Sequence, residues 1–460
     1  MFQCRRGHRI RIGLSSYWPG TVKQPYIRKE RDAMYSKDRY GFRYLGEGIK
    51  ISNDTRVTRL NNNDLVIGSS GSSKTGSIVY PQLKSLEDSS LVVCDTKGKL
   101  SGLMSRDLKK RGFKVKILDF VNPEKSCLYN PLDNIRKVRP GVYKDQDIAK
   151  LAAALMPSGI SKDDPFWELT ARSILEFFIA YTLYALPEED HNMYTVSRLF
   201  LAFQKPNGET AFSSWLREHP ESFAAKRYAQ IKGMQRADKM MSSLNAFVAL
   251  ALKPFDYEEY RNVFDPYYSP GKPCNRRRAG LDMAGLGKEK TVLFLNVSDN
   301  DHSFDAVVNI FYTQILQMLL DEADRHKDGM LEVPIRIIMD DFASSAKIPD
   351  FDKIISVVRS RDIWITMIIQ DYSQLRTLYS ESQATTIENN ADHHIYMGCS
   401  DLSSANFIGT RALKTPEAIL NMDRDKEYVL EAGKPVLLVN KIPSYSFECD
   451  NERSDEDVQM

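Results

Sequence analysis

A glycine- and serine-rich loop between an apolar run and a helix-like stretch carries the clearest chemistry in the sequence. Its spacing follows the phosphate-binding pattern G-x-x-x-x-G-K-[ST], except that Ser73 stands where the second glycine is expected. Backbone N–H groups of such a loop wrap a polyphosphate, while Lys74 would reach the β- and γ-phosphates and the Thr75 hydroxyl would hold Mg²⁺. A flexible connection is the structural alternative. The predicted nucleotide-binding residues are Gly68, Ser69, Ser70, Gly71, Ser72, Ser73, Lys74 and Thr75.

A pair of carboxylates, Asp340 and Asp341, follows the apolar run 335–339. Asp340 is predicted to hold Mg²⁺ through its water shell, and Asp341 to polarise the attacking water. Most hydrolases of this kind have glutamate at the second place, so the shorter Asp341 predicts slower hydrolysis. An N-cap and turn before a helix would explain the same two residues, but the upstream phosphate loop favours the catalytic interpretation.

Three polar residues around the next apolar run complete the candidate catalytic set. Gln370 ends the run 364–369 and is predicted to sense the γ-phosphate, with a helix start as the alternative. Arg359 and Arg361 precede this run, and from there they cannot easily fold back onto their own nucleotide. Arginines so placed could reach the γ-phosphate of a neighbouring subunit as a finger, and are otherwise surface charges.

The elements that must position these residues are short apolar runs alternating with helical patterns. Continuous apolar strands that alternate with helices predict an α/β fold, in which a mainly parallel sheet is covered on both faces. The strand-like runs are 65–67, 91–94, 113–118, 292–295, 335–339, 363–369, 394–397, 427–430 and 435–438.

Between the third and fourth of these runs the sequence is almost entirely helical. One nucleotide-binding domain interrupted by an all-α insertion is the simplest interpretation. The predicted parts are a basic, loosely structured N-terminal arm at 1–60, a discontinuous nucleotide-binding domain at 61–139 and 266–447, an all-α domain at 140–265, and an acidic, disordered tail at 448–460.

Composition excludes several other classes of protein. The 460 residues include 63 Lys/Arg and 61 Asp/Glu, so bulk positive charge cannot be the means of binding nucleic acid. The six cysteines are too widely spaced for a metal knuckle or a dense disulfide framework. No apolar run approaches the roughly 20 residues of a membrane-spanning helix. We therefore expect a soluble, cytoplasmic protein.

Taken together, the motifs resemble those of the type IV secretion coupling ATPases of conjugation, the TraG/TraD family. They occur in that family's order and spacing over more than four-fifths of the chain. The motifs are 66–75, Val93-Cys-Asp-Thr-Lys-Gly98, Asn130-Pro-Leu132, Asp164-Pro-Phe-Trp167, Asp340-Asp-Phe-Ala343, Ile348-Pro-Asp-Phe351, Arg359-Ser-Arg361 and Ile369-Gln370 with Ser373-Gln-Leu375.

The resemblance implies a RecA-like P-loop ATPase that works as a hexameric ring and carries an inserted all-α domain for substrate recognition. Such motors sit at the cytoplasmic mouth of a secretion channel, receive a relaxase bound to single-stranded DNA, and help drive it outward using ATP and Mg²⁺. The family pattern gives the candidate residues the roles stated above. It favours Arg359 over Arg361 as the finger that acts in trans.

This sequence departs from the family at Ser73 and at Asp341. It also departs from the family at its beginning, where many members have transmembrane helices. It resembles a variant that lacks the N-terminal anchor. Recruitment to the inner face of the cell membrane is then expected through a small membrane-anchor partner, or through the basic arm at an anionic surface.

Two other functions stay open at this point. Ser73 and Asp341 also fit a substrate receptor at the channel that binds nucleotide weakly or is catalytically impaired. A generic DNA translocase acting on duplex DNA is the third possibility, and the helical insertion with its Asp-Pro-Phe-Trp signature counts against it.

Overall fold

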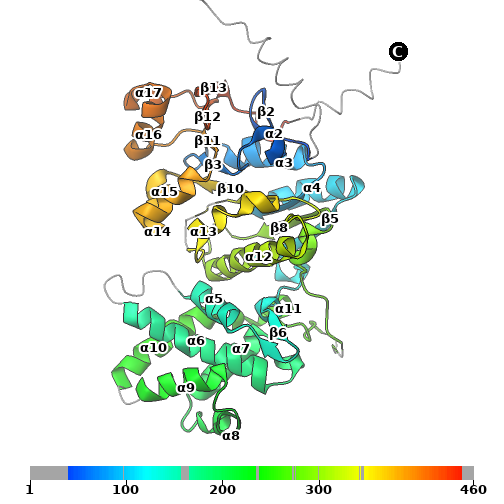
Figure 1. Cartoon of the computed structure of the whole chain (residues 1–460), viewed down its shortest axis with the longest axis vertical. Helices are drawn as coiled ribbons and strands as arrows, with labels where there is room; N and C mark the ends of the chain where they lie inside the picture. The colour runs from blue at the N-terminus through cyan, green and yellow to red at the C-terminus, as the bar shows by residue number, and fades with distance from the viewer. Residues whose placement is uncertain are drawn as a thin grey trace, which may run out of the picture. The chain divides into compact units, whose positions relative to one another are not determined.

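A nine-stranded sheet forms the centre of the computed structural model, which describes residues 40–447 except 97, 157–164, 235–237, 272–273, 275, 299, 341 and 343–346. The strand order is β13-β12-β11-β3-β10-β9-β4-β8-β5 (Figure 1). The seven strands from β11 to β5 are parallel, while β12 and β13 add antiparallel strands at one edge. This confirms the predicted α/β class. The bounds are β3 Asp64–Ile67, β4 Ser90–Asp95, β5 Lys114–Asp119, β8 Thr291–Asn296, β9 Ile335–Met339, β10 Ile363–Ile369, β11 His393–Tyr396, β12 Lys426–Glu431 and β13 Leu437–Asn440.

The central strands of the sheet are buried on both faces, which explains why they are continuous apolar runs. Val66 and Ile338 belong to the core on the face covered by α3 and α4. Their neighbours along the strands, Ile67 and Met339, belong to the core on the other face, which includes α12. The flanking elements are η1 (Thr75–Val79), α3 (Tyr80–Lys84), α4 (Lys99–Lys110), α12 (Asp305–Arg325), α13 (Phe351–Ile355), α14 (Tyr372–Leu378), α15 (Glu381–Asn389), α16 (Leu402–Ala412) and α17 (Pro416–Leu420).

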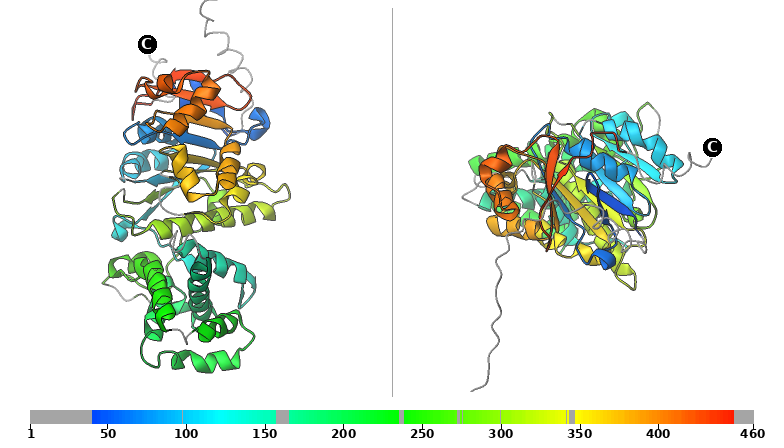
Figure 2. Two further views of the ribbon diagram at one scale, coloured as in Figure 1. Left: turned by 90° about the vertical axis from the view of Figure 1, so that its left-hand side faces the viewer. Right: turned by 90° about the horizontal axis from the view of Figure 1, so that it is seen from above.

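A helical insertion separates β5 from β8, as predicted. It is entered through a small hairpin, β6 (Lys137–Arg139) and β7 (Val142–Tyr143), and its long helix α6 contacts α5, α7, α9 and α10. Helix α12 lies between this insertion and the sheet (Figures 1 and 2). Phe177, Phe178 and Tyr181 of α6 are buried and form core, whereas Phe166 at its start is exposed. The bounds are α5 Asp145–Leu155, α6 Pro165–Ala185, α7 Met193–Phe203, α8 Thr210–Glu218, α9 Phe223–Met234, α10 Asp238–Leu252 and α11 Arg261–Phe264.

The prediction of a loosely structured arm at 1–60 is wrong for residues 42–58. They form the hairpin β1 (Phe42–Gly46) and β2 (Ile49–Ser52) and the short helix α2 (Thr55–Thr58). Leu45 and Ile51 are buried in the core on the α3 and α4 face. Strands this short carry little periodicity in the sequence. The remainder of the predicted arm and the predicted acidic tail lie outside the described residues.

Arg43 joins this hairpin to the sheet. Its guanidinium is buried and donates to both carboxylate oxygens of Asp64 at 3.1–3.2 Å, and it lies 3.1 Å from Nδ1 of His393. Arg336 donates to Asp64 from β9 at 2.8 Å. Burial alone would raise the pKa of Asp64, but the two guanidinium groups hold it well below its usual range. An arginine normally indicates an exposed position, so this buried cluster could not be predicted from the sequence.

Candidate nucleotide site

The phosphate loop, Asp340 and Gln370 lie at the carboxyl edge of neighbouring parallel strands. The phosphate loop follows β3, Gln370 follows β10, and Asp340 follows β9. Strand β4, which ends at Asp95, lies next to β9. Ligands of open α/β sheets bind outside this edge, because the loops there are free to approach them. The order of the strands therefore assembles motifs that are hundreds of residues apart in the chain.

Backbone hydrogen bonds hold the phosphate loop, residues 68–75, between β10 and β11. The Gly68 N–H donates to the Ile369 carbonyl at 3.1 Å, and the Ser69 N–H donates to the Gly398 carbonyl at 2.9 Å. A Cβ on Gly68 would lie 2.5 Å from Oγ of Ser72, so a side chain there would force Ser72 to move. That Oγ is buried and has no hydrogen-bond partner within the described residues. A polar atom left unpaired in this way fits a loop that meets a polar ligand.

Ser73 adopts a left-handed backbone conformation, with φ +69°, and Gly71 does so with φ +80°. This conformation costs a residue with a side chain about 1–2 kcal/mol, which is the physical reason for glycine in the signature. The departure from the signature at Ser73 therefore carries a conformational cost. In the described part of the chain, the N–H groups of Gly71 and Ser73 have no acceptor. They remain available to an anion.

The loop brings an amine, a hydroxyl and a carboxylate together. Nζ of Lys74 donates to the carbonyls of Gly68 at 2.6 Å and Ser69 at 3.1 Å, so the amine lies over the loop. Oγ1 of Thr75 donates to Oδ2 of Asp340 at 3.2 Å. Two motifs identified separately in the sequence are thus in direct contact.

The Thr75 and Asp340 oxygens fit Mg²⁺. This ion prefers hard oxygen ligands, and it is usually held by one or two protein groups together with water and substrate phosphates. Within the described residues, no three His, Cys, Asp or Glu side chains gather to hold a metal. The protein therefore offers two oxygen donors here, and nucleotide phosphates and water would complete the coordination.

The other two predicted catalytic residues around this edge differ in what the structure shows. Asp341 lies outside the described residues. Gln370 is exposed, and its backbone N–H donates to Oε1 of Gln374 at 3.1 Å. Because β10 lies between β3 and β9, Gln370 follows the strand next to the phosphate loop. Its role as a sensor stays a prediction.

The candidate finger arginines lie at the opposite edge of the sheet from the phosphate loop. They belong to a 3-10 turn, Val358–Arg361, that leads into the amino end of β10. Strand β10 has 7 residues, so about 23 Å of strand separates them from that loop. Arg361 is ion-paired with Asp324 at 2.9 Å, whereas Arg359 is exposed and donates to the Arg59 carbonyl at 2.9 Å. Neither arginine can act on its own chain's nucleotide, and a role in trans stays a prediction.

Sequence reasoning missed two residues near the end of the chain that contact the site. Nζ of Lys441 donates to the Ser72 carbonyl at 3.2 Å and to the Met397 carbonyl at 2.9 Å. The N–H of Tyr445 donates to the Gly76 carbonyl at 3.1 Å. No local pattern marks these residues, because Lys441 and Ser72 are 369 positions apart and meet only through the sheet order.

Asp95 is a further carboxylate at this edge, and the structure gives it a different task. It accepts hydrogen bonds from the backbone N–H groups of Lys99 at 3.1 Å and Ser101 at 2.8 Å, at the start of α4. Both bonds satisfy N–H groups that a helix start leaves without partners. Asp95 therefore orders the helix beside the site, while Asp340 is the carboxylate that contacts Thr75.

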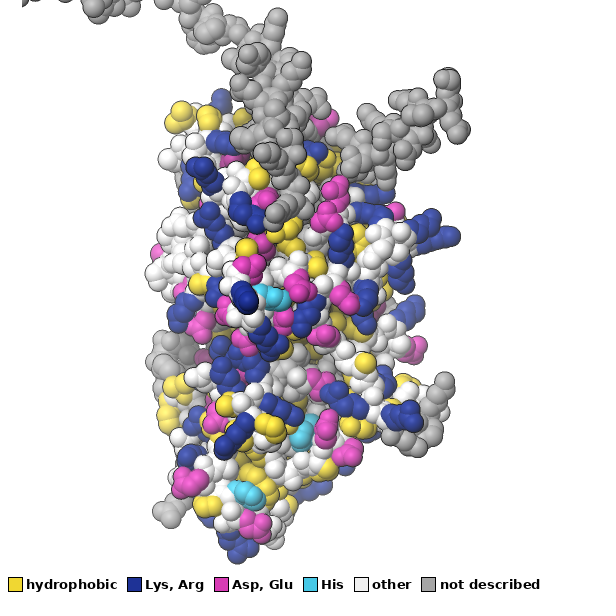
Figure 3. All heavy atoms as spheres, turned by 45° about the vertical axis from the view of Figure 1, so that its right-hand side comes forward, with side chains coloured by type: hydrophobic (Ala, Val, Ile, Leu, Met, Phe, Trp, Pro, Cys, Tyr) yellow, Lys and Arg dark blue, Asp and Glu magenta, His cyan; other side chains and the backbone are white. Residues whose placement is uncertain are grey.

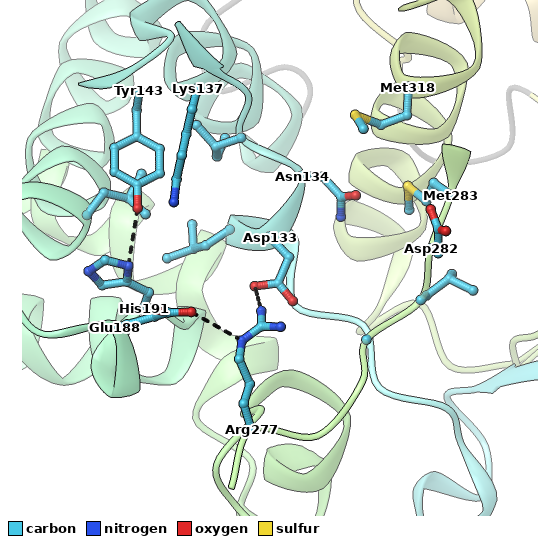
Figure 4. Close-up of a pocket in the computed structure, with 15 residues that line it drawn as sticks. Asp133, Asn134, Lys137, Tyr143, Glu188, His191, Arg277, Asp282, Met283 and Met318 are labelled. Atoms are coloured by element: carbon cyan, nitrogen blue, oxygen red, sulfur yellow. Dashed lines mark hydrogen bonds and ion pairs between the residues drawn. The ribbon is translucent and has the colours of Figure 1, made fainter. Parts of the chain in front are cut away.

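A polar cavity of about 500 Å³ lies where the helical insertion meets the segments around residues 133 and 277–283 (Figure 4). Arg277 lies 2.6 Å from Asp133 and 3.7 Å from Glu188, and the Tyr143 hydroxyl lies 3.4 Å from Nδ1 of His191. Burial raises the pKa of Asp133, and Arg277 opposes this effect. The phosphate loop does not line this cavity. Its paired charges join the insertion to the nucleotide-binding domain.

Charge on the surface is mixed. On the face shown in Figure 3, Lys and Arg side chains alternate with Asp and Glu side chains. This agrees with the near-zero net charge of +2. This side of the molecule is therefore not a broad basic face that would attract nucleic acid.

The sheet, the phosphate loop and the Thr75–Asp340 contact define the class of the fold: an α/β P-loop domain of the RecA-like type with an inserted helical domain. A family model described as Type IV secretory system Conjugative DNA transfer matches residues 10–410, and the chain belongs to that family. The resemblance drawn from the motifs is thereby confirmed. Within the described residues, no helix has both the length and the apolar character that crossing a membrane requires.

The curated relatives are distant and longer than this chain. Protein VirD4 of Rhizobium radiobacter is 22% identical over 416 residues, which cover 83% of this chain and 57% of that protein. Protein VirD4 of Agrobacterium fabrum is 21% identical over 425 residues, which cover 84% of this chain and 60% of that protein. The chain thus spans less than two thirds of the length of these relatives.

Solved structures of the plasmid coupling protein TrwB and of VirB4 share the fold. Plasmid coupling protein TrwB in complex with the GTP analogue GDPNP has a TM-score of 0.66 at 14% identity, over 91% of this chain and 92% of that one. TrwB in complex with ADP and Mg²⁺ has a TM-score of 0.65 at 15% identity, over 91% and 92%. VirB4 of Thermoanaerobacter pseudethanolicus has a TM-score of 0.50 at 11% identity, over 91% and 98%. At these identities the likeness concerns the fold.

Proposed function

We propose that this chain is a conjugative coupling ATPase that binds and hydrolyses ATP to deliver a DNA-bound substrate to a type IV secretion channel. The contact between Oγ1 of Thr75 and Oδ2 of Asp340, 3.2 Å apart beside Lys74, is the observation that carries the proposal. It places a cation-binding pair next to a loop whose N–H groups suit phosphate. Family membership supplies the transport context.

In this mechanism each group acts at a defined place. Lys74 leaves the loop carbonyls to pair with the β- and γ-phosphates, and the loop N–H groups bind the same anion. When bound, Mg²⁺ would neutralise the charge that develops on the β- and γ-phosphate oxygens. Thr75 and Asp340 would hold it, Asp341 would orient the attacking water, and Gln370 would sense the γ-phosphate.

Assembly completes the proposed site. Because about 23 Å of strand separates Arg359 from its own phosphate loop, this arginine serves a neighbouring subunit as a finger in a hexameric ring. The proposed cargo is a relaxase with its single-stranded DNA. The proposed place of work is the inner face of the cell membrane, at the secretion-channel proteins, with a small membrane-anchor protein as a further partner.

ATP turnover, measured with and without single-stranded DNA while light scattering follows the molecular mass, tests the proposal. We expect turnover that DNA stimulates as the mass rises, and its loss in Lys74→Ala. The matched control is Lys434→Ala, which removes an exposed lysine that pairs with Glu431 on the edge hairpin and should leave turnover unchanged. Wild-type turnover no higher than that of Asp340→Asn under every condition would refute the ATPase proposal.

One observation favours a second function, that of a substrate receptor that binds nucleotide weakly. Ser73 carries the conformational cost of φ +69° in the loop that must hold the phosphates. Where nucleotide binding has to hold this conformation, a cost of about 1–2 kcal/mol reduces affinity roughly 5- to 30-fold. Relaxase and DNA binding that persists unchanged in Lys74→Ala and without ATP would favour the receptor over the motor.

A further inference from the structure

The residues that follow β13 run beside the phosphate loop and the helix after it. We name this segment, residues 441–447, the C-terminal strap. At its start, the Lys441 N–H donates to the Asp425 carbonyl at 2.7 Å. At its end, the ring of Phe447 packs on the ring of Tyr44 in β1, with 4.6 Å between centroids. The strap is therefore fixed at its start beside β12 and at its end to the β1–β2 hairpin.

The helix after the phosphate loop depends on the strap for a hydrogen bond. This helix begins as a π turn, in which the N–H of Tyr80 donates to the Thr75 carbonyl. The next donor in this pattern would be Pro81, facing the Gly76 carbonyl, and proline has no N–H. The strap supplies the missing donor, because the N–H of Tyr445 bonds to the Gly76 carbonyl at 3.1 Å.

Lys441 is the strap's contact with the loop itself. Its Nζ lies 3.2 Å from the Ser72 carbonyl and is fixed by a second bond of 2.9 Å to the Met397 carbonyl. The carbonyl and the N–H of a trans peptide unit point in opposite directions. A carbonyl of Ser72 that points to Lys441 therefore turns the N–H of Ser73 away from the strap. In the described part of the chain, that N–H has no acceptor.

We propose that Lys441 is a positioning residue of the phosphate loop, which holds the Ser72–Ser73 peptide so that the Ser73 N–H faces bound phosphate. The inference rests on the proposed nucleotide binding. Glycine at the second signature position would take the left-handed conformation without cost, whereas Ser73 adopts it at φ +69° and needs support. A lysine from the far end of the chain provides that support.

The surroundings of Lys441 suit this task. Burial lowers the pKa of its amine, the carboxylates of Glu427 and Asp425 oppose this effect, and the nearby charge of Lys74 adds to the lowering. Two lysines are thus close to one loop, and the arriving polyphosphate would be attracted by both. Lys74 lies over the loop and is predicted to contact the phosphates, whereas Lys441 bonds to a carbonyl that points out of it.

A double-mutant cycle tests the inference, with binding of a fluorescent ATP analogue and Mg²⁺ as the measurement. Lys441→Met keeps the length of the side chain and removes its donor, and we expect about tenfold weaker binding, typical of a lost hydrogen bond from a charged group. Ser73→Gly should restore the affinity of Lys441→Met to within about threefold of wild type, because glycine needs no support. Lys434→Met, in the turn between β12 and β13, is the control and should bind the ATP analogue as wild type does.

Hydrogen exchange of the loop in nucleotide-free protein gives a second readout. Peptides covering 68–80 should exchange faster in Lys441→Met and return to wild-type rates when Ser73→Gly is added. Binding in Lys441→Met within twofold of wild type would overturn the inference. Equally weak binding in Lys441→Met and in the double variant with Ser73→Gly would also overturn the inference. That result would mean that Lys441 contacts phosphate directly. If wild type and Lys74→Ala both fail to bind nucleotide, the proposed function itself is refuted, and the inference with it.

Discussion

Removing the charge of Asp64 is the sharpest test of how the N-terminal hairpin is held on the sheet. This carboxylate is fully buried and accepts hydrogen bonds from Arg43, from Arg336 and, at 3.2 Å, from the Thr366 hydroxyl. In Asp64→Asn, two buried guanidinium groups lose their counter-charge. Breaking a buried ion pair by removing one partner costs about 3–5 kcal/mol, and the amide oxygen of asparagine retains one acceptor. We therefore expect a loss of about 3 kcal/mol.

Urea unfolding and hydrogen exchange of the peptides covering 42–52 measure the loss. The exchange data should show the hairpin opening first, because Arg43 is its link to Asp64. The pKa of Asp64 is depressed in the folded protein, so its contribution is present above its unfolded value of about 4 and is lost as the pH falls further. The difference between wild type and Asp64→Asn should narrow below about pH 4.

The control removes an exposed carboxylate of the same kind. Asp107 pairs with Arg111 at 3.3 Å on the surface of α4, where the two side chains are 38% and 28% exposed. Such pairs contribute about 0–1 kcal/mol, so Asp107→Asn should be nearly neutral. If Asp64→Asn costs no more than Asp107→Asn, or if the hairpin exchanges as in wild type, the buried cluster does not anchor the hairpin.

Two further predictions concern charges elsewhere in the fold. Burial raises the pKa of Glu427 to about 8, and neither of its carboxylate oxygens has a hydrogen-bond partner within the described residues. Because this pKa is raised in the folded protein, the contribution of Glu427 to stability is lost as the pH rises. The free energy of unfolding of wild type, measured by thermal or urea unfolding, should fall by about 1.4 kcal/mol between pH 7 and 9. Glu427→Gln should not show this fall. Arg359→Ala should leave ATP affinity unchanged and reduce turnover of the assembled ring about a thousandfold, the lower end of the range for a finger arginine, while Arg361→Ala has a small effect. Equal turnover losses in the two arginine variants would exclude Arg359 as the specific finger.

The candidate site shows which of its parts can be predicted from local residue spacing. The sequence predicts that the loop 68–75 binds phosphate, because glycine, lysine and threonine occur in it at the spacing that this task needs. Each of the three residue types has its own physical role there. Asp340 was evident because a carboxylate directly after an apolar run must emerge at the carboxyl edge of the sheet. That the two meet, with Thr75 bonded to Asp340 at 3.2 Å, requires β10 to lie between β3 and β9. No residue in either motif specifies that strand order.

The predicted arm shows where local reasoning fails. Arg43 and Lys50 gave residues 42–52 a polar and basic pattern, and the sequence contains nothing that marks Arg43 as buried. Its burial is stable only because Asp64, Asn62 and His393 come from other elements to satisfy it. An unpaired arginine at the same depth would be prohibitively costly. The partners, and not the residue, decide where such a side chain lies.

By itself, the sequence determined the α/β class, the helical insertion and the loop that suits phosphate, because strand burial and backbone chemistry leave signals within ten or twenty residues. The tertiary structure alone decided that residues 42–58 join the folded domain and that Lys441 holds the Ser72 carbonyl. It also decided that Ser73 takes a conformation that favours glycine. Contacts of this kind join residues hundreds of positions apart, and their free energy depends on distance and desolvation in the folded chain, which no local pattern encodes.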